Sequence, residues 1–417
     1  MKKTLIAVAA AAALTATSAF AEITFGAWLR VLASPVASTG KDVIAGVENS
    51  WGWGARTARI NINGTSEDGK AGFVMGVYND FESGLGQGDD AYLWVKPVDT
   101  VKVSVGKFDS PTNGLRGDFC YGSWNWLRPF NWVRDGEGLT FDGIWRSGLM
   151  VEADPMEGLH AFAVIPMSSS YKSAEETYRN IQIGFGYTIE GVGKLKAQFI
   201  GDYGYTTKSE KTGDYYLDSD DGEIKRKSVD YDKADDKTTG QIGVAFDITA
   251  IENLYVTVGA RFGIADKDYA RDYLKMEFSA GASYQVSETM KFSVDGDYKQ
   301  YQDKVLAGGD DSLFSVGAGV DFTVMDGLAA VADVRYMSNN YGKKGDDGAI
   351  SFLVGVNKSV SSNGSLGIGF QGATNGCGLV MNDGTGIEAG KSYTLGKDGG
   401  DGDEFVWAIP VSVSVWF

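Results

Sequence analysis

Apolar and polar residues alternate one by one over most of this chain, and this period of two constrains its fold more than any other feature. In the segment 22–31, one face collects Ile23, Phe25, Ala27, Leu29 and Val31. Successive side chains of a β-strand point to opposite faces, so the alternation predicts a strand. The pattern recurs at 57–64, 71–80, 90–97, 101–108, 140–153, 159–166, 180–190, 194–205, 240–250, 253–264, 274–286, 290–301, 313–325, 328–337, 349–359, 364–373 and 405–417. The chain is therefore predicted to be all-β, with about 16 to 18 strands.

The connections between these segments alternate in length. Short turns lie at 66–69, 97–100, 154–158, 190–193, 250–253, 287–289, 325–327 and 361–364. Longer polar connections lie between them at 32–56, 109–139, 206–238, 339–348 and 374–404. When neighbouring strands are antiparallel, every second connection falls on the same rim of the sheet. The pattern therefore predicts a transmembrane antiparallel β-barrel with short periplasmic turns and long extracellular loops.

The two faces of the predicted strands differ in polarity. The last strand places seven apolar residues on one face, namely Phe405, Trp407, Ile409, Val411, Val413, Val415 and Phe417. The polar face of the segment 180–190 carries Gln182, Gly184 and Thr188. In a barrel the apolar faces contact lipid, and the closed sheet satisfies every backbone group there. A soluble β-sandwich also alternates, but so many long strands with alternating short and long connections favour the barrel.

Residues 1–21 have the features of a secretory signal peptide. Lys2 and Lys3 precede an apolar run, and small residues up to Ala21 fit a cleavage site. A single membrane anchor is the alternative, but the run is shorter than the roughly 20 residues that a bilayer requires. We expect a cleaved signal peptide at 1–21, one barrel domain at 22–417 and a location in a bacterial outer membrane.

The formal net charge of the chain is −17. Nucleic acids bind to clustered basic surfaces, so this acidic balance argues against nucleic acid as a partner. No stretch after the signal peptide approaches ~18 uninterrupted apolar residues, and no transmembrane helix is expected. The lipid of the outer membrane is the partner that the apolar faces predict.

The segment 109–138 is both aromatic and charged. Its residues of these kinds include Arg116, Asp118, Trp124, Trp126, Arg128, Trp132, Arg134, Asp135 and Glu137. The segment is too aromatic for a solvated loop and too polar for a core strand, so we expect it to line an opening. Tryptophan rings beside charged groups suit sugars, whose apolar faces stack on aromatics while their hydroxyls form hydrogen bonds. Alternatively, the tryptophans anchor the loop to the wall or lie in the interfacial girdle.

Polar faces that point inward would line the barrel with charge. The early strands contribute Arg30, Arg59, Lys96, Lys102, Arg146 and Lys196, and the later strands contribute Asp247, Glu277, Asp295, Asp297, Asp321 and Asp333. A basic wall facing an acidic wall would select ions and polar solutes. The alternative is a mixed wall, because the second half also carries Arg261, Lys275, Lys291, Lys299 and Arg335.

The chain resembles the Gram-negative porins in its signal peptide, its even number of strands, its short and long rims, its enlarged third long connection and its final Trp416-Phe417. The resemblance implies that 109–138 folds into the barrel and narrows it. It also implies that Phe417 is read by the barrel-assembly machinery and that the protein forms a homotrimer. Two features depart from the family: a Pro-Glu-Phe-Gly-Gly run is absent from the third loop, and the connection at 82–88 is short, whereas porin trimers often use it as a latch.

We therefore expect a non-enzymatic porin that passes small hydrophilic solutes and ions by passive diffusion. A sugar-selective channel is the alternative within this class. From another class, the alternative is a surface adhesin or a structural protein of the outer membrane, whose long loops bind other molecules. The single histidine, His160, adjoins a short turn, which argues against a histidine base near the long loops.

No cofactor and no metal are expected. The acidic loops at 214–223 and 398–404 could hold Ca²⁺ through carboxylate oxygens, but their acids lack a fixed spacing, which favours solvated loops. Cys120 and Cys377 fall in long connections on the same rim of an exported protein. A disulfide between them and two free thiols both remain open.

Overall fold

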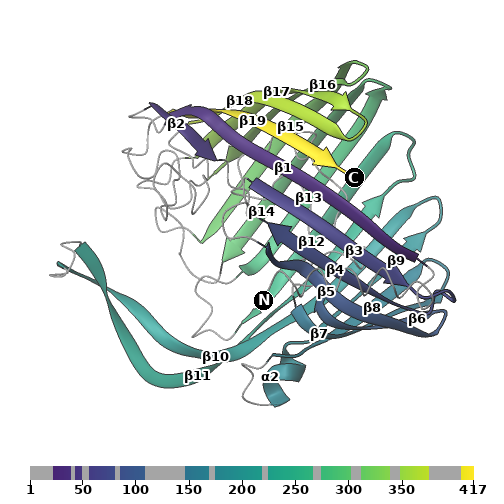
Figure 1. The fold of residues 1–417 in the computed structure, drawn as a ribbon. Helices are drawn as coiled ribbons and strands as arrows, with labels where there is room; N and C mark the ends of the chain where they lie inside the picture. Colours follow the sequence, from purple (N-terminus) through teal and green to yellow (C-terminus); the bar gives the residue numbers. More distant parts are fainter. Residues whose placement is uncertain are drawn as a thin grey trace.

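The strands of the chain form one antiparallel sheet that closes on itself (Figure 1). This computed structural model describes residues 22–38, 43–48, 56–79, 85–108, 146–168, 174–217, 224–265, 274–301, 311–338, 348–374 and 405–417. Over these residues the sheet has 19 strands, of which 18 form the barrel and one is additional. The strands are β1 (Glu22–Ser38), β2 (Val43–Glu48), β3 (Arg56–Thr65), β4 (Ala71–Asn79), β5 (Leu85–Val98), β6 (Val101–Phe108), β7 (Arg146–Met156), β8 (Leu159–Pro166), β9 (Gln182–Ile189), β10 (Gly193–Leu217), β11 (Ile224–Ile248), β12 (Leu254–Ala265), β13 (Leu274–Ser287), β14 (Met290–Tyr301), β15 (Ser312–Met325), β16 (Leu328–Met337), β17 (Ala349–Ser361), β18 (Gly364–Ala373) and β19 (Val406–Trp416).

The first strand closes the barrel because both of its edges are paired. One edge of β1 pairs with β3 along 22–31, and the other pairs with β19, where Trp28 lies opposite Trp416. The terminal Phe417 extends this ladder: its N–H donates to the Ala27 carbonyl at 2.7 Å, and the Ala27 N–H donates to the Phe417 carbonyl at 3.0 Å. A closed sheet leaves no unpaired edge, which is the condition for a sheet in lipid.

The predicted loop at 32–56 was wrong in part, because much of it is strand. β1 continues to Ser38, and β2 pairs with this continuation, with Val36 opposite Ala45. The ladder between β1 and β19 is irregular between Ala33 and Val36, where Pro35 lies. Proline has no N–H to donate and is tolerated at such irregularities. Because the proline interrupts the alternation, the strand predicted from the sequence was too short.

The predicted loop at 206–238 was also wrong, because β10 and β11 form a long hairpin. Their ladder runs from Gly193 opposite Ile248 to Leu217 opposite Ile224. β9 pairs with β10 only as far as Ile200, and β12 pairs with β11 only from Thr239 onward. The outer part of the hairpin is therefore a two-stranded ribbon, which extends away from the barrel in Figure 1. Among the described strands, no third strand pairs with this ribbon, so no difference between two environments imposed the apolar and polar alternation by which its strands could be found.

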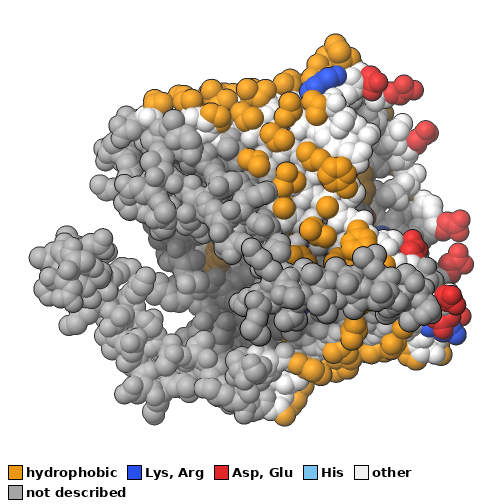
Figure 2. Space-filling model, viewed as in Figure 1, with side chains coloured by type: hydrophobic (Ala, Val, Ile, Leu, Met, Phe, Trp, Pro, Cys, Tyr) orange, Lys and Arg blue, Asp and Glu red, His pale blue; other side chains and the backbone are white. Residues whose placement is uncertain are grey.

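The outer surface of the barrel is an apolar band (Figure 2). On the outer face Phe185 is 39% exposed and Ile242 is 46% exposed, whereas the inward-facing Gln182 is fully buried. This is the polarity expected of a barrel wall in lipid. Within the described residues, no helix combines the length and apolarity that crossing a membrane would need.

The rim of short turns is acidic, as the red side chains on the right of Figure 2 show. In the β3–β4 turn, the Ser66 hydroxyl and the Lys70 backbone N–H both donate to Asp68. These bonds favour the ionised form and lower the pKa of the Asp68 carboxyl. On the opposite rim the short helix α2 (Ala174–Arg179) precedes β9 and carries an ion pair between Glu175 and Arg179 at 2.6 Å.

Candidate functional site

The inner wall of the barrel is polar, and it is built from the alternate residues of each strand. On β11, Asp247 is 3% exposed, whereas the outward-facing Val244 is 45% exposed. Three described serines of the inner face, Ser279, Ser293 and Ser315, occupy successive strands and are buried. The wall that encloses the lumen is therefore the candidate site, and its charged groups determine which solutes it favours.

A buried ion pair joins β10 and β11. The Lys196 ammonium lies 2.6 Å from Asp247, and their side chains are 1% and 5% exposed. The hydroxyl of Thr257 on β12 donates to the same carboxylate at 2.9 Å. Charges buried to this degree are tolerated only when they are paired and hydrogen-bonded.

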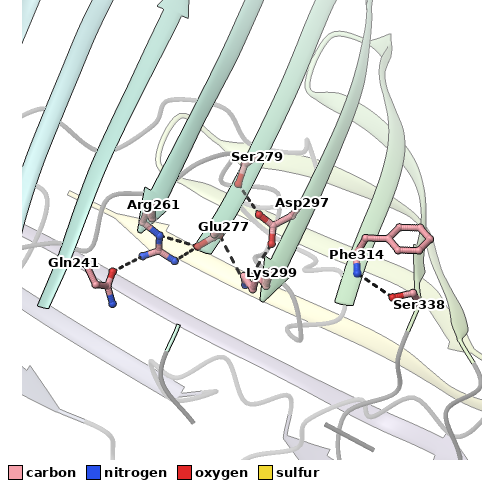
Figure 3. Close-up of polar contacts among 8 residues, drawn as sticks. All are labelled: Gln241, Arg261, Glu277, Ser279, Asp297, Lys299, Phe314 and Ser338. Atoms are coloured by element: carbon pink, nitrogen blue, oxygen red, sulfur yellow. Dashed lines mark hydrogen bonds and ion pairs between the residues drawn. The ribbon is translucent and has the colours of Figure 1, made fainter. Parts of the chain in front are cut away.

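A larger network crosses the four neighbouring strands β11 to β14 on the same inner face (Figure 3). Its side chains are Gln241 on β11, Arg261 on β12, Glu277 and Ser279 on β13, and Asp297 and Lys299 on β14. Arg261 donates to Glu277 through both Nε, at 2.7 Å, and Nη2, and it reaches Gln241 at 3.4 Å. Lys299 lies 4.0 Å from Glu277 and 3.4 Å from Asp297. Two cations and two carboxylates thus compensate each other along neighbouring strands.

Arg59 is the centre of a third polar cluster, on β3 to β5. Its guanidinium donates to Asn61 at 2.6 Å and to Asp90 at 3.2 Å. It also lies over the ring of Tyr78, 5.4 Å from the centroid. Farther along the same wall, Lys102 pairs with the mostly buried Glu152 at 2.7 Å. Arg59 and Lys102, two of the six cations predicted from the early strands, thus each have a carboxylate partner on a nearby strand.

Aromatic side chains of β5 lie on this inner face beside the cations. The Lys96 ammonium is 5.9 Å from the centroid of Trp94, and that of Lys102 is 6.0 Å from Tyr92. Such distances fit cation–π contacts. The sequence interpretation missed Tyr92, Trp94, Asp90 and Glu152. The signal that could have identified the two aromatics is their position two and four residues before Lys96, which places all three on one face.

An apolar patch interrupts the polar wall next to these aromatics. Phe108, Met150, Phe162 and Val164 pack together and are at most 3% exposed, with Tyr92 against them. The rings of Tyr92 and Phe108 are 5.3 Å apart. The patch shares the inner face with Ser104 and Glu152, and Phe108 is the last residue of β6.

The described side chains of the predicted pore set all lie on the inner face. They are Arg59, Lys96, Lys102, Asp295, Asp297 and Asp333. Whether separate basic and acidic walls exist was left open by the sequence. The observed pairs, such as Lys196 with Asp247 and Lys291 with Asp321 at 3.4 Å, favour the mixed wall.

Other predicted residues lie outside the described part of the chain. Arg30 and Arg146 belong to β1 and β7, but their side chains are not among those described. The whole segment 109–138 is outside the described residues, with Arg116, Asp118, Trp124, Trp126, Arg128, Trp132, Arg134, Asp135 and Glu137. The same holds for Cys120, Cys377, the signal peptide at 1–21 and the side chains of both acidic loops. Among the side chains that are described, no group of three or more His, Cys, Asp or Glu could hold a metal ion.

Removing the carboxylate of the buried pair should destabilise the barrel more than removing that of an exposed pair. We expect Asp247→Asn to cost about 3 to 5 kcal/mol, because Lys196 would be left buried without a counter-charge. The matched change Asp321→Asn, whose pair with Lys291 is about one third exposed, should cost less than about 1 kcal/mol. Urea unfolding of the two variants in detergent measures the difference. Lys196→Met combined with Asp247→Leu should recover most of the loss, and equal effects of the two single changes would contradict the burial argument.

Known structures with a similar fold identify the fold class of the chain. No model of a known protein family matches the chain, and neither does any curated protein sequence. Among solved structures, a variant of OccD1 (OprD) matches with a TM-score of 0.50 and 11% identity, covering 96% of each chain. An anion-selective porin from Comamonas acidovorans matches with a TM-score of 0.44 and 15% identity, over 95% of this chain and all of the other. OmpT, an outer membrane protein of Vibrio cholerae, matches with a TM-score of 0.43 and 14% identity, over 95% and 97%. The predicted fold class is confirmed: the chain has the fold of a porin-like antiparallel β-barrel.

Proposed function

We propose that the protein is an outer-membrane porin through which small hydrophilic solutes and ions diffuse passively. The closed barrel with a polar inner wall and an apolar outer band is the observation that carries this proposal. Charges inside lipid are expensive unless they line a water-filled space or pair with one another, and the inner wall has many. No reacting group is needed for diffusion, and so the proposed activity is transport and not catalysis.

The segment 109–138 is proposed to narrow the channel. Along the chain, the nearest described residues on either side of this segment are Phe108, which ends β6, and Arg146, which begins β7. The apolar patch of Phe108, Met150, Phe162 and Val164 lies on the inner wall at this point. These side chains are at most 3% exposed, so other groups cover them although they lie on the inner face. We propose that tryptophans of 109–138, which follows Phe108 in the chain, form part of this cover.

The remaining partners are proposals of the same kind. The signal peptide at 1–21 would export the chain, and the barrel-assembly machinery would read Phe417, which is 80% exposed at the end of β19. Homotrimers are proposed from the resemblance to porins. Ca²⁺ at the acidic loops stays the weaker alternative to solvated carboxylates, and no cofactor is proposed.

Deleting residues 116–134 should widen the channel. We expect the purified wild-type barrel to give stable current steps in planar lipid bilayers and the deletion to raise the unit conductance about two-fold or more. Deleting a stretch of equal length, 380–398, from the last long loop is the control and should leave the conductance near that of the wild type.

Two outcomes would count against these proposals. A folded barrel that never conducts would exclude a porin and favour the adhesin or structural protein. An unchanged conductance after the deletion of 116–134, in a barrel that still folds, would exclude the constriction.

A sugar-selective channel is the second candidate, and the inner-face position of Tyr92 and Trp94 favours it. Aromatic faces beside Lys96 and Lys102 provide both of the contacts that sugars use, stacking and hydrogen bonds. If sugars bind here, a sugar added to the bath should block the current, and Trp94→Ala should weaken the block about three- to ten-fold. Trp407→Ala, on the outer face, is the matched control and should leave the block unchanged. If no sugar blocks the current, the sugar-selective channel is excluded and the general diffusion channel remains.

A further inference from the structure

An apolar groove of about 510 Å³ runs along the outer face of the barrel over β15 to β18. Its floor on β16 is made of small side chains, Ala330 and Ala332. Phe322 and Val320 lie opposite these alanines on β15, and Val356 lies opposite Ala330 on β17. Phe322 is 38% exposed and Val356 is 40% exposed, which places the groove on the surface that faces lipid.

The chemistry of the groove fits a hydrocarbon chain. The lining is apolar, and the backbone groups of β15 to β18 are already paired within the continuous ladders of the sheet. An added β-strand or a polar solute would therefore find no hydrogen-bond partner in it. The exposed apolar band that surrounds it marks the hydrocarbon region of a membrane, in which acyl chains are the abundant apolar groups.

A cation lies at the short-turn end of this groove. Lys358 follows Val356 by two residues on β17, so both point outward, about 7 Å apart along the strand. Its ammonium donates to the backbone carbonyl of Asp326 at 3.3 Å, beside the turn that leads into β16. Lysines near a membrane surface extend their ammonium groups to the level of lipid headgroups.

The short-turn rim that surrounds this cation is mostly acidic. Exposed carboxylates in the described short turns belong to Glu67, Asp68, Asp99, Asp154, Glu157, Glu190, Glu252, Glu288 and Asp326. These groups repel a lipid phosphate, whereas Lys358 attracts it. Within one molecule, a glycerophospholipid has a phosphate and an acyl chain separated by its glycerol, which matches the order of cation and groove.

We propose that the groove and Lys358 together bind one anionic glycerophospholipid of the periplasmic leaflet. An acyl chain lies over Ala330 and Ala332, and the phosphate contacts the Lys358 ammonium. This inference rests on the membrane location within the proposed function but not on conduction. A bound lipid of this kind would tie the outer wall at β15 to β18 to the leaflet on the short-turn side.

A tryptophan of the barrel lies close enough to the groove to report lipid binding by its fluorescence. Trp407 on β19 lies next to Phe370, a lining residue, with ring centroids 5.9 Å apart. The fluorescence of Trp407 is obtained by subtracting the emission spectrum of the Trp407→Phe variant from that of the wild type. The full barrel is reconstituted in phosphatidylcholine vesicles that contain increasing fractions of phosphatidylglycerol with a brominated acyl chain, which quenches nearby tryptophan. Brominated phosphatidylcholine and brominated diacylglycerol are the comparison probes.

We expect brominated phosphatidylglycerol to quench Trp407 at a lower mole fraction than either comparison probe. Lys358→Gln should reduce this preference about five-fold, because one cation near the surface is lost. Ala332→Phe fills the groove and should abolish the preference. Ala280→Phe, at an exposed alanine on the outer face of β13, is the matched control and should change nothing.

Two results would overturn the proposal. One is equal quenching by all three probes that Lys358→Gln leaves unchanged, which would mean ordinary solvation by lipid. The other is a Trp407 that no brominated lipid quenches, together with an oligomer in solution, which would mean that a second copy of the chain covers the groove. The conductance of Lys358→Gln, expected to equal that of the wild type, separates a failure at this site from a failure of the channel proposal.

Discussion

Every backbone N–H and C=O of a sheet in lipid must find a partner within the protein, and this constraint shapes the rest of the molecule. The sheet meets it by closing, with β1 paired to β3 on one edge and to β19 on the other. The hydrogen bonds between Phe417 and Ala27 continue this closure to the end of the chain. Once the sheet is closed, each strand has one face toward lipid and one toward the lumen, and the alternation of the sequence follows from that division.

The charged side chains of the inner face then each require a partner of opposite charge. Lys196 with Asp247, Lys102 with Glu152 and the network around Glu277 each meet this need with partners on neighbouring strands. Cross-strand pairs of this kind hold adjacent strands in register and offset much of the charge on the described part of the wall. A compensated wall suits a channel that admits solutes by size and polarity more than by sign. Selectivity would then depend on the groups that narrow the lumen, which is why the tryptophan-rich segment matters to the proposed function.

The barrel could be predicted from the sequence because the alternation of apolar and polar residues has a local cause. Each face of a strand has a different environment, and this difference acts on every residue of the strand. Ile183 and Gln182 could be assigned to opposite faces without knowledge of any neighbour. Register was not predictable in the same way: that Lys102 meets Glu152 depends on which residues lie opposite each other across two strands. The pattern also failed where its cause was absent. Beyond Ile200 the β10–β11 ribbon pairs only with itself, and Pro35 interrupted the pattern in β1.

The reversal potential of the barrel across a KCl gradient, compared between the wild type and Glu277→Gln, tests most directly whether a compensated wall lines the channel. With its charges balanced, the wild type should show a permeability ratio of K⁺ to Cl⁻ near one. Glu277→Gln leaves Arg261 and Lys299 in excess over Asp297, and the reversal potential should shift toward that of an anion-preferring channel. A strongly selective wild-type channel whose reversal potential does not change in Glu277→Gln would contradict the compensated wall.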